Sequence, residues 1–155
     1  MSTPRKSFNP VLATNRKARR NYEILEQLEA GIVLTGTEVK SARQSNVSLE
    51  EGFGVEQDGE LWLMQVHIQP YQHGNRFNHD PVRPRKLLVS KGERERLFSK
   101  MRAKGLTIVP LDLHLSKGCM KVQIALGRGK DHVDKREDLK RKTDEREIQR
   151  ALRGR

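Results

Sequence analysis

Apolar and polar residues alternate along several short stretches of the chain, a spacing that predicts β-strands. The clearest pair of stretches covers residues 47–57 and 60–68, which are separated by Asp58-Gly59. Asp-Gly is a common two-residue connection between antiparallel strands. In the second stretch, Leu61 and Leu63 should face one side of a sheet, and the residues next to them the other side. The pattern therefore predicts a β-hairpin.

Further strands are predicted in apolar runs elsewhere in the chain. They are residues 32–36 (IVLTG), residues 87–89 (LLV), and two or three strands around a Lys117-Gly118 turn within residues 106–127. Helical spacing predicts three more segments. They are residues 15–30, which begin at the N-cap residue Asn15, residues 37–44, which begin at Thr37, and residues 90–105, which end at Gly105. Many short strands with few helices are typical of a small β-barrel, so we expect a mainly β fold with about three peripheral helices.

The two ends of the chain differ from this pattern. Residues 1–14 are predicted to be a flexible basic arm, and residues 15–128 a single barrel domain. Residues 127–155 hold eleven Lys or Arg, seven Asp or Glu, and only five apolar residues, which do not form a continuous helical stripe. Such a segment buries too little apolar surface to offset its ordering entropy. We expect a tail, residues 129–155, that is disordered when free and helical against a polyanion.

The charge of the chain indicates the kind of partner. The formal net charge is +11 and the isoelectric point is near 10.2, which favours phosphate polymers. No stretch approaches the roughly 18 consecutive apolar residues of a membrane span. Cys119 is the only cysteine, so no intrachain disulfide can form. We expect a cytoplasmic protein that binds nucleic acid and does not contact a membrane.

No pattern of residues predicts catalysis. The five histidines lack the spacing of a zinc motif, and no Cys-x-x-Cys pair accompanies them. Cys119 lies in a predicted strand, where a lone cysteine is typically a small buried apolar residue. A triad of this cysteine with a His and an Asp stays open as an alternative. We expect no enzyme activity, no metal and no cofactor.

Basic side chains gather in two segments ahead of the tail. They are Arg16, Lys17, Arg19 and Arg20 near the N-terminus, and Arg83, Arg85 and Lys86 in a predicted loop over residues 70–86. Either cluster alone could be a solvated face, but together with the tail they indicate contacts with the backbone of structured RNA. For Glu29 and Glu38, composition favours a role in helix solubility. The alternative is a carboxylate that accepts hydrogen bonds from bases or orients a basic neighbour.

Seven stretches of the chain together resemble the SmpB family of SsrA-binding proteins. They are NRKARRNYEI (15–24), EAGIVLTGTEVKSAR (29–43), GELWL (59–63), IQPY (68–71), HDPVRPRKLLV (79–89), GLTIVPL (105–111) and GKDHVDKRE (129–137). The resemblance implies an oligonucleotide-binding-fold barrel that binds the tRNA-like domain of transfer-messenger RNA. It also implies delivery of that RNA to stalled 70S ribosomes for trans-translation, with elongation factor Tu and alanyl-tRNA synthetase acting on the same RNA. We expect a monomer.

The resemblance also implies roles for individual residues. Asn15, Glu29 and Leu88 match residues that the family needs for RNA binding. Charge and placement add Lys40 and the two basic clusters to this set. The tail residues that match the family element for accommodation in the ribosome are Gly129, Lys130, Asp134, Lys135 and Arg136, with His132 as the candidate ring for stacking on ribosomal RNA. Asp131 and Val133 depart from the family pattern. The alternatives are a structural ribosomal protein and an RNA-modifying or RNA-cleaving enzyme.

Overall fold

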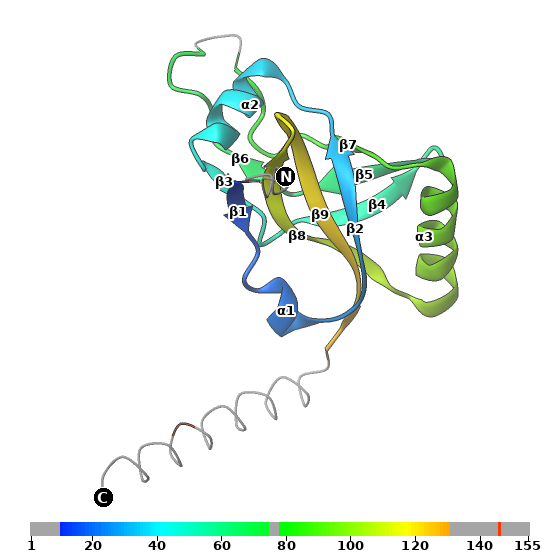
Figure 1. Cartoon of the computed structure of the whole chain (residues 1–155). Helices are drawn as coiled ribbons and strands as arrows, with labels where there is room; N and C mark the ends of the chain where they lie inside the picture. Colours follow the sequence, from blue (N-terminus) through cyan, green and yellow to red (C-terminus); the bar gives the residue numbers. More distant parts are fainter. Residues whose placement is uncertain (1–9, 75–77, 131–145, 147–155) are drawn as a thin grey trace, which may run out of the picture.

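The computed structural model describes residues 10–74, 78–130 and 146 of the chain. Its strands are β1 (Val11–Thr14), β2 (Tyr22–Ile32), β3 (Val47–Ser48), β4 (Phe53–Gln57), β5 (Glu60–Met64), β6 (His67–Ile68), β7 (Arg85–Leu88), β8 (Thr107–Ser116) and β9 (Cys119–Gly129) (Figure 1). Its helices are α1 (Ala18–Asn21), α2 (Gly36–Arg43) and α3 (Lys91–Lys104). The expected disorder of the tail lies outside the described residues.

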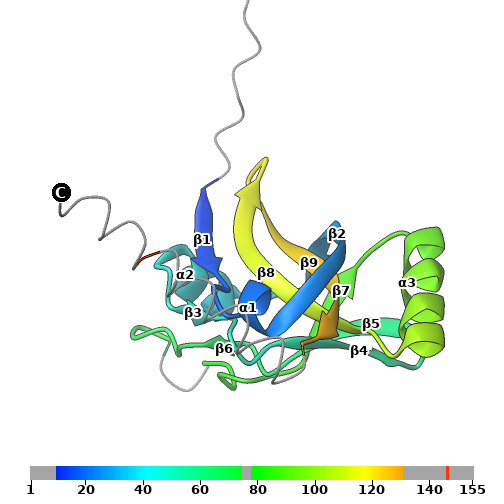
Figure 2. The ribbon, with the colours of Figure 1, turned by 90° about the horizontal axis from the view of Figure 1, so that it is seen from below.

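The strands close into an antiparallel barrel. Seven of them form one sheet in the order β1-β8-β4-β5-β7-β2-β9, and a further pairing of β8, the second strand in this order, with β9, the last, closes the barrel. Figure 2 shows this curved wall from below, with α2 and α3 on opposite sides of the barrel. Strands β3 and β6 form a separate two-stranded sheet. The expected class, a mainly β barrel of the oligonucleotide-binding-fold type with peripheral helices, is confirmed.

The core fills the inside of this barrel. Leu61 and Leu63 are fully buried, as the alternation in β5 predicts, and Trp62 is less buried on the other face. The remaining inward side chains come mainly from β7, β8 and β9: Leu87, Ile108, Leu113, Val122, Ile124 and Leu126. Helix α3 adds Leu97 and Phe98 to the same core, and it ends before Gly105, as predicted.

Several predicted elements differ in the structure. Residues 22–32 form strand β2 and not the helix predicted over residues 15–30. Exposed residues alternate with more buried ones from Tyr22 to Ala30, and pairing with β9 and β7 satisfies the backbone of this strand. Only Ile32 of the strand predicted over residues 32–36 belongs to a strand. The cap of α2 is Thr35 and not Thr37.

The structure also differs from the predictions at the two ends of the barrel and at the cysteine. Strand β1 pairs with β8, so residues 11–14 belong to the barrel and not to a free arm. At the other end, β9 continues to Gly129, one residue beyond the predicted domain boundary. Cys119 is exposed at the start of β9, which corrects the expectation of a buried apolar side chain.

Candidate nucleic-acid interface

The outer surface of four neighbouring strands brings together residues from distant parts of the chain. In an antiparallel pair, residues that lie directly opposite each other point to the same face. One row of opposite residues runs across β8, β9, β2 and β7: His114, Lys121, Gly31 and Leu88. The next row is Asp112, Gln123 and Glu29. We call this surface the β8-β9-β2-β7 face.

Leu88 is an unusually exposed apolar side chain on this face, with 52% of its surface accessible. It lies against Gly31, where an added Cβ atom would be 3.1 Å from the Cβ of Leu88. Both residues line a hollow of about 370 Å³, whose apolar lining also includes Leu34, Val39 and Met120. An exposed aliphatic side chain beside an apolar hollow offers a surface on which an unstacked base can pack.

Glu29 is held in place by a histidine from β8. The Nε2 atom of His114 lies 2.8 Å from the Oε2 atom of Glu29, and its Nδ1 atom lies 2.6 Å from the Oδ1 atom of Asp112. Burial opposes the charged form of His114, but the hydrogen bonds to Glu29 and Asp112 outweigh it and raise the pKa of the imidazole. Glu29 still exposes 46% of its side chain, so its carboxylate remains open to a partner.

Asn15 fixes helix α1 to the same face. Its side-chain amide donates to the carbonyl oxygens of Leu49, at 3.2 Å, and Pro110, at 2.9 Å. Its Oδ1 atom accepts a hydrogen bond of 3.2 Å from the backbone N–H of Ala18, the first residue of α1. Ala18 then packs on the outer side of the sheet, against Val109, Leu111 and Ala125. Asn15 is itself buried, so it acts on this surface by holding α1 in place.

We therefore expect Asn15→Ala to lower the free energy of unfolding by about 1–3 kcal/mol, because three buried hydrogen bonds are lost. The carbonyl oxygen of Leu49 keeps its bond from the backbone N–H of Gly52. Chemical denaturation followed by circular dichroism would measure this loss. The matched control is Asn21→Ala, which changes a partly buried asparagine of α1 whose side chain has no recorded hydrogen bond within the described chain. Equal stability of Asn15→Ala and the unchanged protein would contradict this role.

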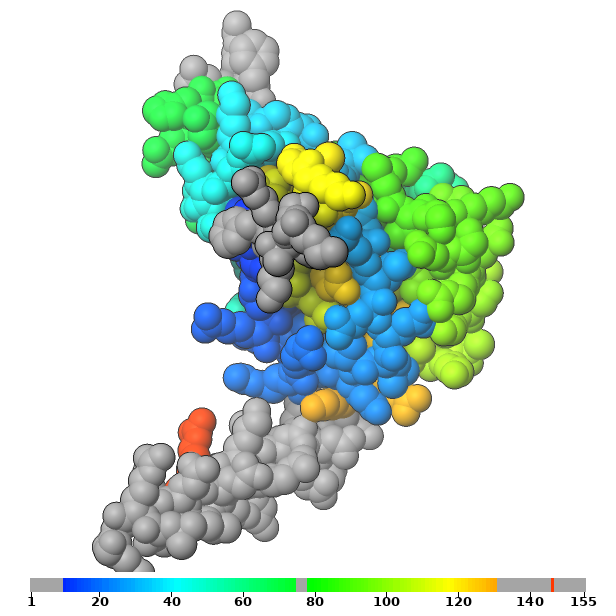
Figure 3. Space-filling model, viewed as in Figure 1, coloured from blue at the N-terminus to red at the C-terminus, as the bar shows by residue number. Residues whose placement is uncertain are grey.

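Three of the four basic residues around α1 lack an acidic partner among the described residues. Arg16, Arg19 and Arg20 are exposed, and none of them forms an ion pair with a carboxylate of the described residues. Lys17 is paired with Glu50 at 3.3 Å. Figure 3 shows residues around α1 and along β2, in blue, as neighbouring parts of one surface. Helix α1, which carries Arg19 and Arg20, packs through Ala18 on the outer side of the sheet that also carries Glu29. Within the described residues, no carboxylate compensates the charge of the three arginines.

Helix α3 is also basic, but four of its six basic side chains are paired with carboxylates of neighbouring strands. Arg94 pairs with Glu60 at 3.0 Å, Lys100 and Arg96 both pair with Glu26, and Arg102 pairs with Glu56. The hydrogen bond from Lys100 and the charge of Arg96 lower the pKa of Glu26 below its ordinary value. The positive charge of α3 is thus matched locally, which the count of basic residues in the sequence does not reveal.

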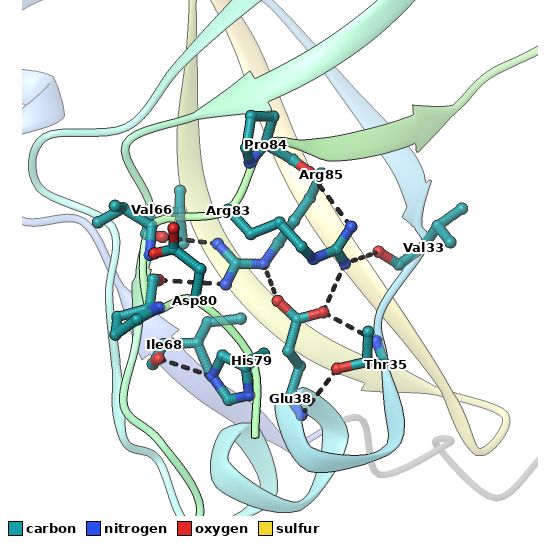
Figure 4. Close-up of polar contacts among 12 residues, drawn as sticks. Val33, Thr35, Glu38, Val66, Ile68, His79, Asp80, Arg83, Pro84 and Arg85 are labelled. Atoms are coloured by element: carbon teal, nitrogen blue, oxygen red, sulfur yellow. Dashed lines mark hydrogen bonds and ion pairs between the residues drawn. The ribbon is translucent and has the colours of Figure 1, made fainter. Parts of the chain in front are cut away.

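The two arginines of the central basic cluster, Arg83 and Arg85, form ion pairs with the same buried carboxylate, that of Glu38. Arg85 is completely buried: its Nε atom donates to Oε2 of Glu38 at 2.5 Å, and its Nη1 atom donates to the carbonyl oxygen of Val66 at 2.6 Å. Arg83 donates to the other carboxylate oxygen of Glu38, also at 2.5 Å (Figure 4). The expected contact of Arg85 with RNA is therefore wrong for this structure, because no part of its side chain reaches the surface.

Glu38 has a different role from the one that composition favours. It is fully buried in α2, so it does not serve helix solubility, and it orients two basic neighbours instead. Burial alone would raise the pKa of Glu38, but the hydrogen bonds from Arg83 and the backbone of Thr35, with the charge of Arg85, lower it. Thr35 and Glu38 also form the capping box of α2.

The remaining residues that are predicted to contact RNA or the ribosome lie at separate places in the structure. Lys86 is half-buried and lies 3.7 Å from Glu60, and Lys40 is exposed with its Nζ atom 5.4 Å from the ring centre of Tyr71. Gly129 ends β9, and the backbone N–H of Lys130, the next residue, donates to the carbonyl oxygen of Asn21 in α1. The predicted tail residues His132, Asp134, Lys135 and Arg136 lie outside the described part of the chain.

Sequence reasoning missed Asp112 and His114 on this face. They are separated from Glu29 by more than eighty residues along the chain, and the separation of His114 from Glu29 is 85 residues. A local signal was nevertheless present, because Asp112 and His114 are the ionisable residues of this strand and alternate with Leu111, Leu113 and Leu115. That alternation points both of them outward.

Two features, a metal-binding cluster and a membrane-spanning helix, are absent from the described residues. No three His, Cys, Asp or Glu side chains gather into a group that could hold a metal ion within the part of the chain that the structure describes. None of the helices in that same part has the length and apolar character needed to span a membrane.

Comparison with known proteins gives consistent matches. The family model described as SmpB protein matches residues 12–154. SsrA-binding protein from Nostoc punctiforme is 54% identical over 145 residues, covering 93% of this chain and 94% of the relative, and the one from Staphylococcus carnosus is 49% identical over 155 residues, covering 100% and 99%. A solved chain from the work described as "tmRNA-SmpB: a journey to the center of the bacterial ribosome" aligns with a TM-score of 0.65 and 49% identity. It covers 77% of this chain and 85% of that one.

Proposed function

Because the chain belongs to the SmpB family of SsrA-binding proteins, we propose that it binds the tRNA-like domain of transfer-messenger RNA and delivers that RNA to stalled ribosomes for trans-translation. A structural relative is described as tmRNA-SmpB in the bacterial ribosome, and its similarity to this chain supports the proposal. In this function the chain is an RNA-binding adaptor and performs no reaction of its own.

The observation that carries the proposal is the composition of one outer surface. Helix α1, which carries Arg19 and Arg20 and follows Arg16, packs on the same outer side of the sheet as the exposed Glu29 and Leu88. None of the three arginines forms an ion pair with a carboxylate of the described residues. Arginines bind the phosphate backbone, whereas a carboxylate and an aliphatic surface contact bases. A surface that offers both kinds of contact suits a folded RNA with unstacked bases.

Each residue would then have a defined part in binding. Arg16, Arg19 and Arg20 neutralise phosphates of the RNA, and Leu88 packs against a base over the hollow beside Gly31. Glu29 accepts hydrogen bonds from base amino groups, which only an acceptor can do. Asn15 contributes by holding α1, and Lys40 and Lys86 add positive charge at more distant points.

The tail has a separate role in this proposal. Residues 129–155 act after RNA binding, by becoming helical in the messenger channel of the stalled ribosome. The tail starts beside α1, because the backbone N–H of Lys130 is bonded to Asn21. Gly129, Lys130, His132, Asp134, Lys135 and Arg136 are the residues that we propose for accommodation in the ribosome.

The partners follow from the same proposal. Elongation factor Tu and alanyl-tRNA synthetase would meet the chain only through the shared RNA, and the chain would act as a monomer in the cytoplasm. A structural ribosomal protein would share the charge and the tail, but it would stay bound to ribosomes that are not stalled.

The test is a competition binding assay at physiological salt, with the labelled tRNA-like domain against an excess of bulk tRNA. We expect tight binding that bulk tRNA does not displace, and loss of this preference in Glu29→Ala. A chain that ends at Lys130 should bind the RNA equally well but fail to support peptide tagging in a translation reaction. Easy displacement by bulk tRNA would contradict the proposed function, and loss of RNA binding on truncation would contradict the separate role of the tail.

A further inference from the structure

The protonation state of His114 follows from its two neighbours. Both ring nitrogens lie within hydrogen-bonding distance of a carboxylate oxygen, at 2.6 Å for Asp112 and 2.8 Å for Glu29. An ionised carboxylate only accepts hydrogen bonds, so each nitrogen must carry a proton. A neutral imidazole donates from one nitrogen only and would turn a lone pair toward one of the two carboxylates. The observed arrangement therefore belongs to the charged imidazolium.

The elements packed around His114 contribute few other charges. On its own strand, β8, the facing group is Asp112, and on β2 it is Glu29. On β9, Lys121 lies directly opposite His114, and the neutral Gln123 lies between Asp112 and Glu29. On β1, the opposite residue is the apolar Val11. Two carboxylates and one lysine thus surround the ring among the described residues.

We propose that His114 is the positioning residue for Glu29, whose carboxylate it aligns for hydrogen bonds from base amino groups of the RNA. This inference rests on the proposed function and adds to it a residue that neither the motifs nor the charge pattern points to. Asp112 anchors the far side of the ring, and only 10% of the His114 side chain is exposed, so the imidazolium has a fixed orientation. Glu29 uses Oε2 for His114 and keeps its other oxygen for the RNA.

The charge of His114 also favours the approach of RNA. Two carboxylates on a phosphate-binding surface repel the RNA backbone, and the imidazolium cancels one of these negative charges. Loss of its proton would free Glu29 from its anchor and add one negative charge to the surface. Both effects act in the same direction and weaken binding.

The direction of the pH dependence follows from the raised pKa of His114. Because the pKa of His114 is raised in the folded protein, the hydrogen bonds of the charged ring stabilise the fold fully below the ordinary histidine pKa of 6.5. This stabilisation is lost as the pH rises through the raised pKa. RNA binding should therefore be tightest on the acid side of this range. It should weaken as His114 becomes neutral.

The test compares dissociation constants for the tRNA-like domain between about pH 6 and about pH 9, a range that includes the ordinary pKa of histidine. His114→Gln should bind about 3- to 10-fold more weakly than the unchanged chain at the lower pH, the worth of one hydrogen bond. The two proteins should bind almost equally at the higher pH. Glu29→Gln, which has no carboxylate to align, should show a smaller pH dependence than the unchanged chain.

The matched control is His67→Gln, which changes an exposed histidine of the separate β3-β6 sheet. Its pH profile should follow that of the unchanged chain. A constant ratio of affinities between His114→Gln and the unchanged chain across the pH range would overturn the inference, because a purely structural role does not change with pH. Titration of the His114 ring by NMR in the free protein tests the pair without RNA, and a midpoint below 6.5 would also overturn it.

These outcomes separate the inference from the proposed function. If the folded protein does not select the tRNA-like domain over bulk tRNA at any pH, the proposed function is wrong. If it selects this RNA but the pH profiles of His114→Gln and the unchanged chain stay parallel, only the role of His114 is wrong.

Discussion

Glu38→Ala should lower the free energy of unfolding by about 3–5 kcal/mol at neutral pH, the loss typical of a buried ion pair that loses one partner. Arg85 is completely buried and has Glu38 as its acidic partner, so the variant would leave a guanidinium without a counter-charge inside the protein. Arg83 would lose the same carboxylate. The capping box of α2 would also be lost, because the side chain of Glu38 accepts from the backbone N–H of Thr35.

Chemical denaturation of both proteins at several pH values would measure this effect. The lowered pKa of Glu38 stabilises the fold above the ordinary value of 4.5, and this contribution is lost as the pH falls through the lower folded-state value. The difference between the two proteins should therefore shrink in acid. Glu51→Ala, which changes an exposed carboxylate, is the control and should change stability by less than about 0.5 kcal/mol. A loss of less than about 0.5 kcal/mol for Glu38→Ala would contradict the stabilising role of its ion pairs with Arg83 and Arg85.

Replacing Arg16, Arg19 and Arg20 together with Gln should weaken binding of the tRNA-like domain by about 100- to 200-fold, since each arginine contributes roughly 1 kcal/mol through a phosphate contact. The slope of the logarithm of affinity against the logarithm of salt concentration should become shallower by about 2, because each lost contact removes roughly 0.7–0.9. Fluorescence anisotropy at several salt concentrations would measure both quantities.

The matched control removes the same number of charges from α3. Replacing Arg94, Arg96 and Arg102 with Gln lowers the net charge equally, but these arginines are already paired with Glu60, Glu26 and Glu56. We expect a change in affinity of no more than about threefold and an almost unchanged salt slope. An equal loss in both triple variants would show that the overall charge of the protein, and not the α1 surface, governs binding.

The elements that sequence reasoning predicted correctly are those with strong local signals. The Asp58-Gly59 turn connects β4 and β5 as expected, and the Lys117-Gly118 turn connects β8 and β9. Helix α3 begins after its cap Ser90 and ends before Gly105. In each case a turn or capping residue marks the boundary, and its preference for a backbone conformation acts over a few residues.

The segment of residues 15–30 shows where local reasoning fails. Its apolar residues fit a helical spacing as well as an alternating one, and it contains several residues with high helix propensity. Only the tertiary structure decides between the two, because β2 forms hydrogen bonds with β9 on one side and β7 on the other. Pairing with strands about sixty to one hundred residues away in sequence outweighs a weak local preference.

The sequence by itself determined the mainly β barrel, the excess of positive charge and the motifs of the family, because these depend on composition, periodicity and short strings of residues. Only the tertiary structure decided which charged residues are available to bind RNA. Arg85 and Glu38 neutralise each other in the interior, the arginines of α3 are paired, and Glu29 meets His114 across three strands. Burial and pairing of charges depend on distances between residues that are far apart in the chain, and those distances exist only in the folded protein.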